Sequence, residues 1–307
     1  MKQYYIGVDG GGTKTAIALA RANEPPVTVI TGSGCSYQML GIDGAVSAIV
    51  QGVDDLLRQA SAARSECFGC CVGLPCYGED ARQDTVLTEK LQAALAPIPV
   101  HIVNDVEVGW AGALECGAGI HLVAGTGSIA FAKNADGKTA RCGGWNEFFG
   151  DEGSCYWLGR EAMSVFSKQA DGRLPRGALY EIVRRELALG QDLDFIDAVI
   201  KEYAPYRDKV ASFQRLAAQA ALAEDVCVLR LYDRAARELA QMAGALKQQL
   251  DLPDGAPVSY SGGLFQTGDL ILKPLKKEVA ALHCRLLATR RSALEGAVLL
   301  AEQKYNT

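Results

Sequence analysis

The stretch GVDGGGTKT, from Gly7 to Thr15, decides the fold class of this chain. Before the glycines, residues 4, 6 and 8 are apolar and share one face of a predicted strand, and residues 15–20 alternate in the same way after them. A strand, a glycine-rich turn and a second strand indicate a β-hairpin. A Walker A loop and a dinucleotide-binding fingerprint are excluded, because each needs a helix directly after its glycines.

The tip of this hairpin has the composition of a phosphate-binding loop. Gly11 and Gly12 carry no Cβ, so their backbone N–H groups can approach a phosphate closely. Thr13 adds a hydroxyl donor and Lys14 a positive charge, while Asp9 can hold Mg²⁺ through water. An ordinary tight turn is the alternative interpretation of the same residues.

The elements that follow form a pattern that occurs twice. In the first half we predict strands at 27–31, 68–74 and 100–104 and helices at 43–61, 84–95 and 106–115. The second half repeats strand, glycine turn and strand at 120–132, followed by a strand at 139–142, helices across 153–250, strands at 258–261 and 285–288, and a helix at 292–304. Two modules that open alike indicate an internal duplication of fold.

This duplication predicts the domain organisation. We expect an α/β chain with an N-terminal domain at 1–115, a C-terminal domain with a helical insertion at 116–290, and a final helix, 291–307, that packs back on the first domain. A cleft between two such domains is a natural ligand site. The second glycine tip, Gly125-Thr126-Gly127, strengthens the phosphate interpretation of the first, because two such tips can hold a polyphosphate between them.

A carboxylate follows the predicted strand at 100–104. Asp105 comes directly after Asn104, and side chains at the carboxyl ends of such strands lie at the mouth of an α/β cleft. Asp105 can therefore accept a proton from a hydroxyl that attacks a phosphoryl group. The alternative is that Asp105 is the N-cap of the next helix.

Two further segments carry candidate binding residues. Gly144 and Trp145 lead to Asp151, and an exposed ring face with a carboxylate is typical of sugar binding, although Asp151 or Ser154 can instead cap the following helix. Gly262 and Gly263 follow a strand, where a flat nucleoside can lie against bare backbone, or where the chain merely turns into a helix.

Composition narrows the functional classes. The 307 residues correspond to about two domains. A net charge of −5 without a basic cluster argues against nucleic-acid binding. The chain shows neither a long apolar segment nor a signal peptide, so we expect a cytoplasmic protein that does not bind membranes.

The cysteines and histidines are expected to be structural. In a chain of this kind the ten cysteines are expected to be reduced thiols. Cys67, Cys70, Cys71 and Cys76 include one C-x-x-C but lack the second pair that a zinc site needs. We expect His101 and His121, which lie in predicted strands, to be core or interface residues.

Taken together, the motifs resemble one superfamily. GVDGGGTKT (7–15), VNDVEVGWAGAL (103–114), AGTGSIAF (124–131), GGWNEFFGDEGSCYWLGREAM (143–163) and YSGGLF (260–265) resemble the acetate and sugar kinase/Hsp70/actin group. More narrowly, the chain is similar to the BadF/BadG/BcrA/BcrD ATPase family, in its N-acetylglucosamine kinase branch. The resemblance implies two ribonuclease H-like, actin-like ATPase domains around a cleft, and usually a homodimer.

The resemblance also implies a role for each motif. ATP phosphates would bind at Thr13 and its glycines and at Thr126 and Gly127, with Asp9 near Mg²⁺ and with Gly262 and Gly263 near the nucleoside. Asp105 would be the general base for the sugar 6-hydroxyl. The sugar site would be lined by Gly144, Trp145, Asn146 and Asp151.

Two departures from the family pattern fall on the sugar side. Ser36 stands where the family usually has an asparagine, and Asn146 replaces the usual glycine. A serine has one hydroxyl in place of an amide, so a direct sugar contact can be lost or bridged by water. The phosphate loops are unchanged, which favours an ATP-dependent amino-sugar kinase while leaving N-acetylglucosamine, glucosamine, N-acetylmuramic acid or a plain hexose open.

Two other functions compete with the kinase. The clustered cysteines motivate an ATPase activator of an iron–sulfur dehydratase or reductase, which would need a cluster at a subunit interface. A non-catalytic sugar sensor would normally carry a DNA-binding segment, and the chain opens directly on its first strand.

Overall fold

The computed structural model describes residues 3–12 and 14–306. The chain divides into two compact units. Unit 1 consists of Met1–Ala118 and Ala288–Thr307, and unit 2 of Gly119–Leu287. Each unit contains one five-stranded mixed sheet.

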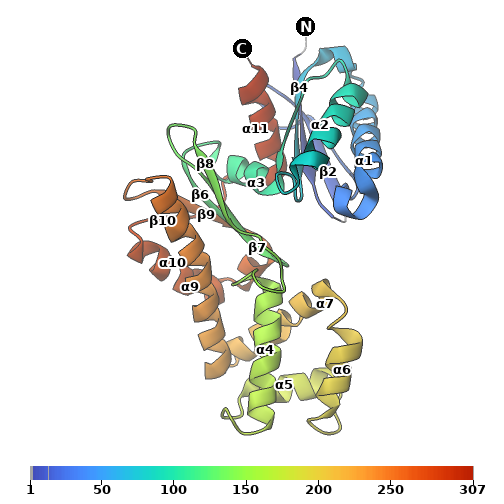
Figure 1. The fold of residues 1–307 in the computed structure, drawn as a ribbon. Helices are drawn as coiled ribbons and strands as arrows, with labels where there is room; N and C mark the ends of the chain where they lie inside the picture. The colour runs from blue at the N-terminus through green and yellow to red at the C-terminus, as the bar shows by residue number, and fades with distance from the viewer. Residues whose placement is uncertain (1–2, 13, 307) are drawn as a thin grey trace. The chain divides into compact units, whose positions relative to one another are not determined.

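The sheet of unit 1 has the strand order β3-β2-β1-β4-β5 (Figure 1). Its strands are β1 (Tyr4–Gly10), β2 (Lys14–Arg21), β3 (Thr28–Ser33), β4 (Cys67–Leu74) and β5 (Val100–Asn104). The first three form an antiparallel meander, and β4 and β5 add parallel to β1. The predicted hairpin around the first glycine tip is therefore confirmed.

Helices cover both faces of this sheet. They are α1 (Tyr37–Ala60), α2 (Ala81–Leu95), α3 (Asp105–Leu114) and α11 (Ala293–Tyr305), with a short 3₁₀ turn η1 (Arg64–Glu66). Ile6 and Val8 point to the face where α1 and α2 bury Ile49, Leu56 and Leu87. Because side chains alternate along a strand, Tyr5 and Gly7 face the other side, where Gly7 lies against α11.

Helix α1 begins earlier than its periodicity indicates. The predicted helix at 43–61 matches the part after Gly41, whose φ of 70° interrupts the helix. The first turn, from Tyr37, is a separate helical segment, and its residues Met39 and Leu40 are exposed. Tyr37 is the one buried residue among the three, and a single buried residue is too little for hydrophobic periodicity to mark a helical turn.

Helices α3 and α11 cross in very close contact. A Cβ at Gly296 would lie 2.1 Å from the carbonyl oxygen of Val108, and one at Gly112 would lie 2.0 Å from that of Ser292. The backbone N–H of Arg291 donates to the carbonyl of Gly112 at 3.1 Å. No larger residue fits this crossing, so the late helix α11 forms part of the core of unit 1.

The sheet of unit 2 repeats the topology of the first. Its order is β10-β9-β6-β7-β8, from β6 (Gly119–Ala124), β7 (Ser128–Lys133), β8 (Thr139–Gly143), β9 (Pro257–Ser261) and β10 (Arg285–Leu287). Again the first three strands are an antiparallel meander and the last two add in parallel. The predicted duplication of fold is confirmed.

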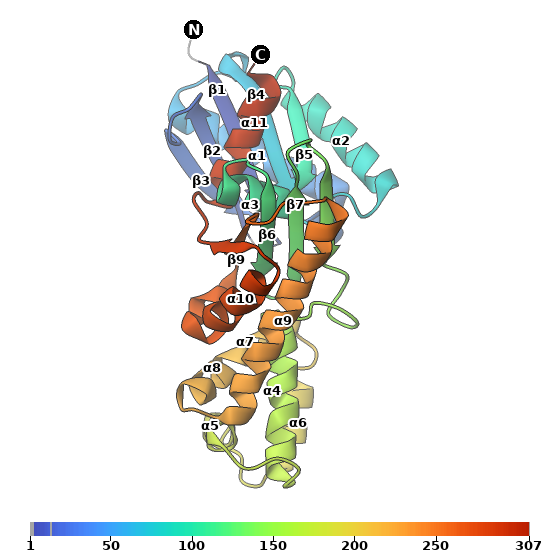
Figure 2. The ribbon, with the colours of Figure 1, turned by 90° about the vertical axis from the view of Figure 1, so that its left-hand side faces the viewer.

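A helical insertion separates β8 from β9. It consists of α4 (Cys155–Ala170), α5 (Ala178–Glu186), α6 (Asp194–Glu202), α7 (Arg207–Ser212), α8 (Gln214–Leu222) and α9 (Val226–Gln249), while η2 (Gly263–Thr267) and α10 (Asp269–Ala281) follow β9. Figure 2 shows α9 beside β6 and β7 and the shorter helices grouped around α4. In the described residues no helix has the length and apolar character needed to span a bilayer.

Candidate functional site

The carboxyl ends of three parallel strands bring the candidate residues of unit 1 to one edge. Asp9 pairs in register with Gly73, and Leu74 with Asn104, so β1, β4 and β5 end together. Strand β3 runs in the same direction, because it is antiparallel to β2, and it leads directly to Ser36. Asp9, Ser36 and Asp105 therefore belong to one edge of the sheet, as expected for a ligand site in an α/β fold.

Asn104, and not Asp105, caps helix α3. The side-chain oxygen of Asn104 accepts a hydrogen bond from the N–H of Val106 at 3.1 Å, and its amide nitrogen donates to the carbonyl of Tyr77 at 2.9 Å. The interpretation of Asp105 as the N-cap is therefore wrong. Asp105 is the first residue of α3, and its carboxylate is not needed for the cap.

The electrostatic environment of Asp105 suits a proton acceptor. Burial raises the pKa of Asp105 to about 6, and the negative charges of Asp9 and Glu79 act in the same direction. A base whose pKa lies near the working pH is largely ionised and still binds a proton strongly enough to accept it from a hydroxyl. Glu79, on the loop after β4, was not predicted, because no local pattern marks a residue that reaches the site from another strand.

Of the residues at this edge of the sheet, Asp9 is the best candidate to hold a magnesium ion. Burial raises the pKa of Asp9, and the charge of Lys14 lowers it. The repulsion between Asp9 and Asp105 is relieved by a cation, and hard oxygen donors are what Mg²⁺ prefers. Among the described residues no cluster of three or more His, Cys, Asp or Glu is arranged to hold a metal, so most ligands would be water and phosphate.

The loop between β3 and α1 carries a second residue that sequence reasoning did not select. Cys35 is fully buried, and its N–H donates to the carbonyl of Gly11 at 3.0 Å, which fixes the loop against the first glycine tip. Burial raises the pKa of the Cys35 thiol, and the charges of Asp9 and Asp105 contribute in the same direction. Ser36 is buried at the N-cap position of α1, but its side chain makes no capping hydrogen bond.

The first glycine tip is open to ligands. Gly12 and Lys14 are exposed, and a Cβ at Gly12 would meet only the sulfur of Met39, at 3.7 Å. Gly11 is half-buried. Thr13, which the resemblance assigns to the phosphates, lies outside the described residues.

The second glycine tip is fixed by the start of α4. The carbonyls of Gly125 and Thr126 accept hydrogen bonds from the N–H groups of Cys155 and Tyr156, at 2.9 and 3.2 Å. The N–H of Gly125 donates to the carbonyl of Gly127 at 2.9 Å. With its carbonyls turned toward α4, the tip can direct the N–H groups of Thr126 and Gly127 toward an anion.

Asp151 lies against this tip. Its carboxylate is 3% exposed, accepts a hydrogen bond from the N–H of Ser128 at 3.2 Å, and pairs with Arg207 at 2.5 Å. A Cβ at Gly127 would lie 2.8 Å from both carboxylate oxygens of Asp151. Ser154, whose Oγ accepts from the N–H of Trp157 at 3.1 Å, is the helix cap, so the capping role left open for Asp151 is wrong.

The segment between β8 and Asp151 is exposed. Trp145 has an exposed fraction of 75%, and Gly144 is fixed by a 2.9 Å hydrogen bond from its N–H to the carbonyl of Ser128. The side-chain oxygen of Asn146 accepts from the N–H of Phe148 at 3.0 Å, which shapes the turn locally. The Trp145 ring therefore has a free face on which a sugar can stack.

The two glycines after β9 have different surroundings. Gly262 has a φ of 112°, and a Cβ there would lie 2.4 Å from the carbonyl oxygen of Ala124. The fold alone therefore requires glycine at 262. A Cβ at Gly263 would meet nothing within 4 Å, so Gly263 presents open backbone at the strand end.

The cysteine cluster lies in the interior of unit 1. Cys67, Cys70 and Cys71 are buried in β4. Burial raises the pKa of Cys67 to about 12 and raises those of Cys70 and Cys71 further, so these thiols stay protonated. A protonated buried thiol is neither a metal ligand nor a nucleophile.

His121 is a structural residue, as expected. It is fully buried in β6 and contacts the hydroxyls of Ser259 and Ser261, at 2.8 and 2.9 Å, across the β6–β9 pair. Burial lowers its pKa to about 4, so the ring is neutral at neutral pH. His101 lies in β5, also as predicted.

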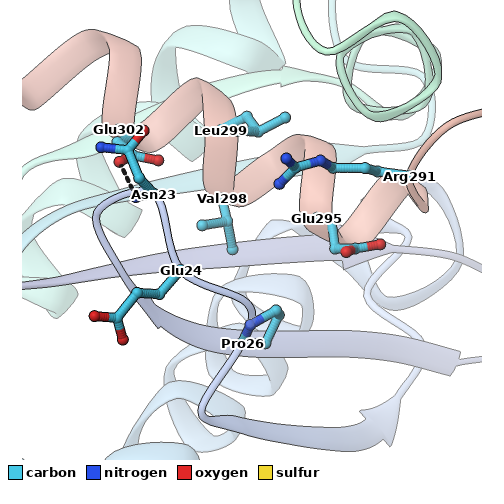
Figure 3. A pocket seen from close by; sticks show the side chains of 8 residues that line it. All are labelled: Asn23, Glu24, Pro26, Arg291, Glu295, Val298, Leu299 and Glu302. Atoms are coloured by element: carbon cyan, nitrogen blue, oxygen red, sulfur yellow. Dashed lines mark hydrogen bonds between the residues drawn. The ribbon is translucent and has the colours of Figure 1, made fainter.

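A separate hollow in unit 1 lies between the β2–β3 connection and α11 (Figure 3). It has a volume of about 80 Å³, and Glu302 at its side accepts a hydrogen bond from the N–H of Asn23 at 2.6 Å. Asn23 follows the end of β2 that pairs with the start of β1, whereas Asp9 is near the end of β1. The hollow is thus at the opposite end of the sheet from the candidate site.

Comparison with known proteins identifies the class to which this fold and site correspond. The chain belongs to the BadF/BadG/BcrA/BcrD ATPase family, whose model matches residues 6–301. The resemblance expected from the motifs is therefore confirmed, and the match extends over both units.

Three relatives are similar along nearly their whole length. An N-acetylmuramic acid/N-acetylglucosamine kinase of Clostridium acetobutylicum is 25% identical over 98% of this chain and 99% of its own. An N-acetyl-D-glucosamine kinase of Dictyostelium discoideum is 28% identical over 98% of each chain. A solved structure from Chromobacterium violaceum, assigned as an N-acetylglucosamine kinase, is 28% identical, with a TM-score of 0.74 over 97% of this chain and 98% of that one.

Proposed function

We propose that this protein is an ATP-dependent kinase that phosphorylates the 6-hydroxyl of an amino sugar, with N-acetylglucosamine as the first candidate. The observation that carries the proposal is Asp105, a carboxylate at the strand-end edge of unit 1 whose pKa burial raises to about 6. The kinase relatives, which match nearly the whole chain, support the same reaction class.

Asp105 is the proposed general base. Its carboxylate accepts the proton of the sugar hydroxyl while the hydroxyl oxygen forms a bond to the γ-phosphorus of ATP. The bond between that phosphorus and the β,γ-bridging oxygen breaks, which yields the sugar phosphate and ADP. Bound Mg²⁺, held near Asp9, would neutralise charge on the phosphates.

The two glycine tips are the proposed phosphate-binding loops. In unit 1 the donors are the backbone of Gly11 and Gly12, the hydroxyl of Thr13 and the ammonium of Lys14. In unit 2 they are the N–H groups of Thr126 and Gly127, on a loop that α4 fixes through the carbonyls of Gly125 and Thr126. Gly263 has open space at its Cα and is proposed to lie against the nucleoside. Gly262 packs closely on Ala124 and so fixes the strand end next to Gly263.

Each unit carries groups that we propose suit a sugar. Ser36 contributes a hydroxyl that makes no capping hydrogen bond, and Asp105 contacts the reacting hydroxyl. In unit 2, Trp145 offers an exposed ring face and Asp151 a fixed carboxylate that can accept a hydroxyl hydrogen bond, with Gly144 and Asn146 shaping the segment. One aromatic face and two carboxylates match a polyhydroxylated ring.

A coupled assay of ADP release tests the proposal. N-acetylglucosamine, glucosamine, N-acetylmuramic acid and glucose are offered with ATP and Mg²⁺, and we expect at least one amino sugar to stimulate turnover. Asp105→Asn should lower kcat by about 10²-fold or more while ATP still binds. Asp55→Asn, an exposed carboxylate on α1, is the control and should leave turnover unchanged.

The proposal fails if no sugar of the panel stimulates ADP release, or if Asp105→Asn retains full turnover. The homodimer and the cytoplasmic location stay predictions. The oligomeric state can be measured by light scattering coupled to size-exclusion chromatography.

A further inference from the structure

Arg207 joins two acidic residues of unit 2, one within the exposed segment that follows β8 and one at the end of that segment. Its Nη2 donates to Oδ2 of Asp151 at 2.5 Å, and its Nε lies 3.2 Å from Oε2 of Glu147. Asp151 is almost fully buried, whereas the ion-pair partner Glu147 is 30% exposed. One guanidinium therefore spans the segment from residue 147 to residue 151.

The position of Arg207 is fixed by the packing of α7 on α4. A Cβ at Gly159 in α4 would lie 2.0 Å from the carbonyl oxygen of Val210, so the two backbones are in direct contact. Val210 and Ala211 are buried at this contact. Since α4 also fixes the second glycine tip through Cys155 and Tyr156, the tip and Arg207 are attached to the same helix.

Asp151 depends on this arginine. Its other oxygen accepts from the N–H of Ser128, so the two carboxylate oxygens have one donor each. A buried carboxylate that loses its cationic partner is left with an unpaired oxygen and turns toward water. A hydrogen-bonding group for a sugar hydroxyl would then be displaced.

We propose that Arg207 is a positioning residue for sugar binding, which keeps the Asp151 carboxylate in place and holds the segment 145–149 through Glu147. The proposal rests on the proposed function, because it assigns Arg207 to the sugar side of that site. It makes the helical insertion part of the substrate site, although Arg207 lies outside every motif from which the site was predicted.

Steady-state kinetics of Arg207→Ala test the proposal. Misplacing one binding group costs up to ~10²-fold, so we expect a tenfold or larger rise of KM for the sugar. The KM for ATP should rise by a smaller factor than the KM for the sugar, although Arg207 also lies beside Gly127 of the second glycine tip. Arg207→Lys, which keeps one donor for Asp151, should recover part of the loss. Arg185→Ala is the control, because that exposed arginine pairs only with the neighbouring Glu186 in the described ion pairs.

The double variant separates positioning from general destabilisation. If Arg207 acts through Asp151, adding Arg207→Ala to Asp151→Asn should cost no more than about twofold further. A purely structural role would reduce the amount of active enzyme, which lowers apparent kcat and leaves both KM values unchanged. Unchanged kinetics of Arg207→Ala, or fully additive losses in the double variant, would overturn the proposal.

Hydrogen exchange gives a readout that does not depend on catalysis. In Arg207→Ala, amides across 145–151 and the N–H of Ser128 should exchange faster than in the wild type, and peptides of unit 1 should be unaffected. Faster exchange in a protein that phosphorylates no sugar would support the positioning role while the kinase proposal fails. Unchanged exchange across 145–151 would refute the positioning role even in an active kinase.

Discussion

Asp105 and Asp9 share the strand-end edge of unit 1, and burial together with the negative charge of Asp9 raises the pKa of Asp105 to about 6. The same two features that make Asp105 a useful base also make its ionised form costly. Activity and stability are therefore expected to respond to pH in opposite directions at this residue.

The first prediction concerns the pH dependence of turnover. Asp105 must be ionised to accept a proton, so kcat/KM for the sugar should fall about tenfold per pH unit below its pKa of about 6. Rates measured from pH 5 to 8, with ATP and Mg²⁺ saturating, give the profile. A rate that stays constant down to pH 5 would contradict the assignment of Asp105.

The second prediction concerns stability. The folded-state pKa of Asp105 lies above the ordinary value of 3.8, so the folded protein favours the protonated form. The group stabilises the fold fully below pH 3.8, and that contribution is lost as pH rises through 6. Asp105→Asn removes the penalty, so the variant should be more stable than the wild type by about 3 kcal/mol at pH 8. Denaturant midpoints of the variant and the wild type, measured at pH 8 and at pH 5, give the difference in stability. An equal difference at both pH values would exclude burial of the ionised Asp105 as its cause.

His121 should give the opposite pH dependence. Burial lowers its pKa to about 4, below the ordinary value of 6.5, so the folded state disfavours the charged ring. The contribution of His121 is fully present above pH 6.5 and is lost as pH falls toward 4, by about 3 kcal/mol. His121→Gln should therefore be less stable than the wild type at pH 7.5, with a gap that narrows by pH 4.5. The matched control is His283→Asn, at an exposed histidine outside the β6–β9 contact.

Alanine substitutions at the two glycines after β9 should have different effects, one on stability and the other on ATP binding. Gly262→Ala places a Cβ 2.4 Å from the carbonyl of Ala124 at a φ of 112°, so this variant should lose stability, seen as a lower melting temperature. Gly263→Ala meets nothing within 4 Å and should melt like the wild type, while its KM for ATP rises. Equal melting temperatures for both variants would show that the contact at Gly262 is not essential.

Trp145 should contribute to sugar binding without contributing to stability. Its exposed fraction is 75%, so Trp145→Ala removes little buried surface. Loss of a stacking contact should raise KM for the sugar roughly three- to tenfold. Phe68→Ala, an exposed aromatic on β4, is the control and should leave KM unchanged. If Trp145→Ala has the same KM for the sugar as the wild type, the Trp145 ring is not part of the sugar site.

The strand pattern and the motif positions could be predicted from the sequence, because both are local. Alternation marks the strands around each glycine tip, and α9 (Val226–Gln249) lies within the region 153–250 where helices are predicted. The first turn of α1 escaped prediction because Met39 and Leu40 face solvent.

The residues that surround the site could be predicted only in part. Glu79 and Cys35 reach the edge of the sheet from loops whose own sequences carry no signal, and Arg207 comes from a helix 56 residues after its partner Asp151. Such contacts depend on the tertiary fold. The same is true of Gly262, whose requirement for glycine arises from Ala124, a neighbour on another strand.

The crossing of α3 and α11 has a consequence for synthesis on the ribosome. Gly296 and Ser292 emerge only after all of unit 2 has been made, yet they complete the interior of the unit whose strands emerge first. The strands of unit 1 therefore keep one apolar face exposed while about half of the chain, which forms unit 2, is still being translated. Unit 1 is therefore the half expected to need a chaperone, although it begins to be synthesised first.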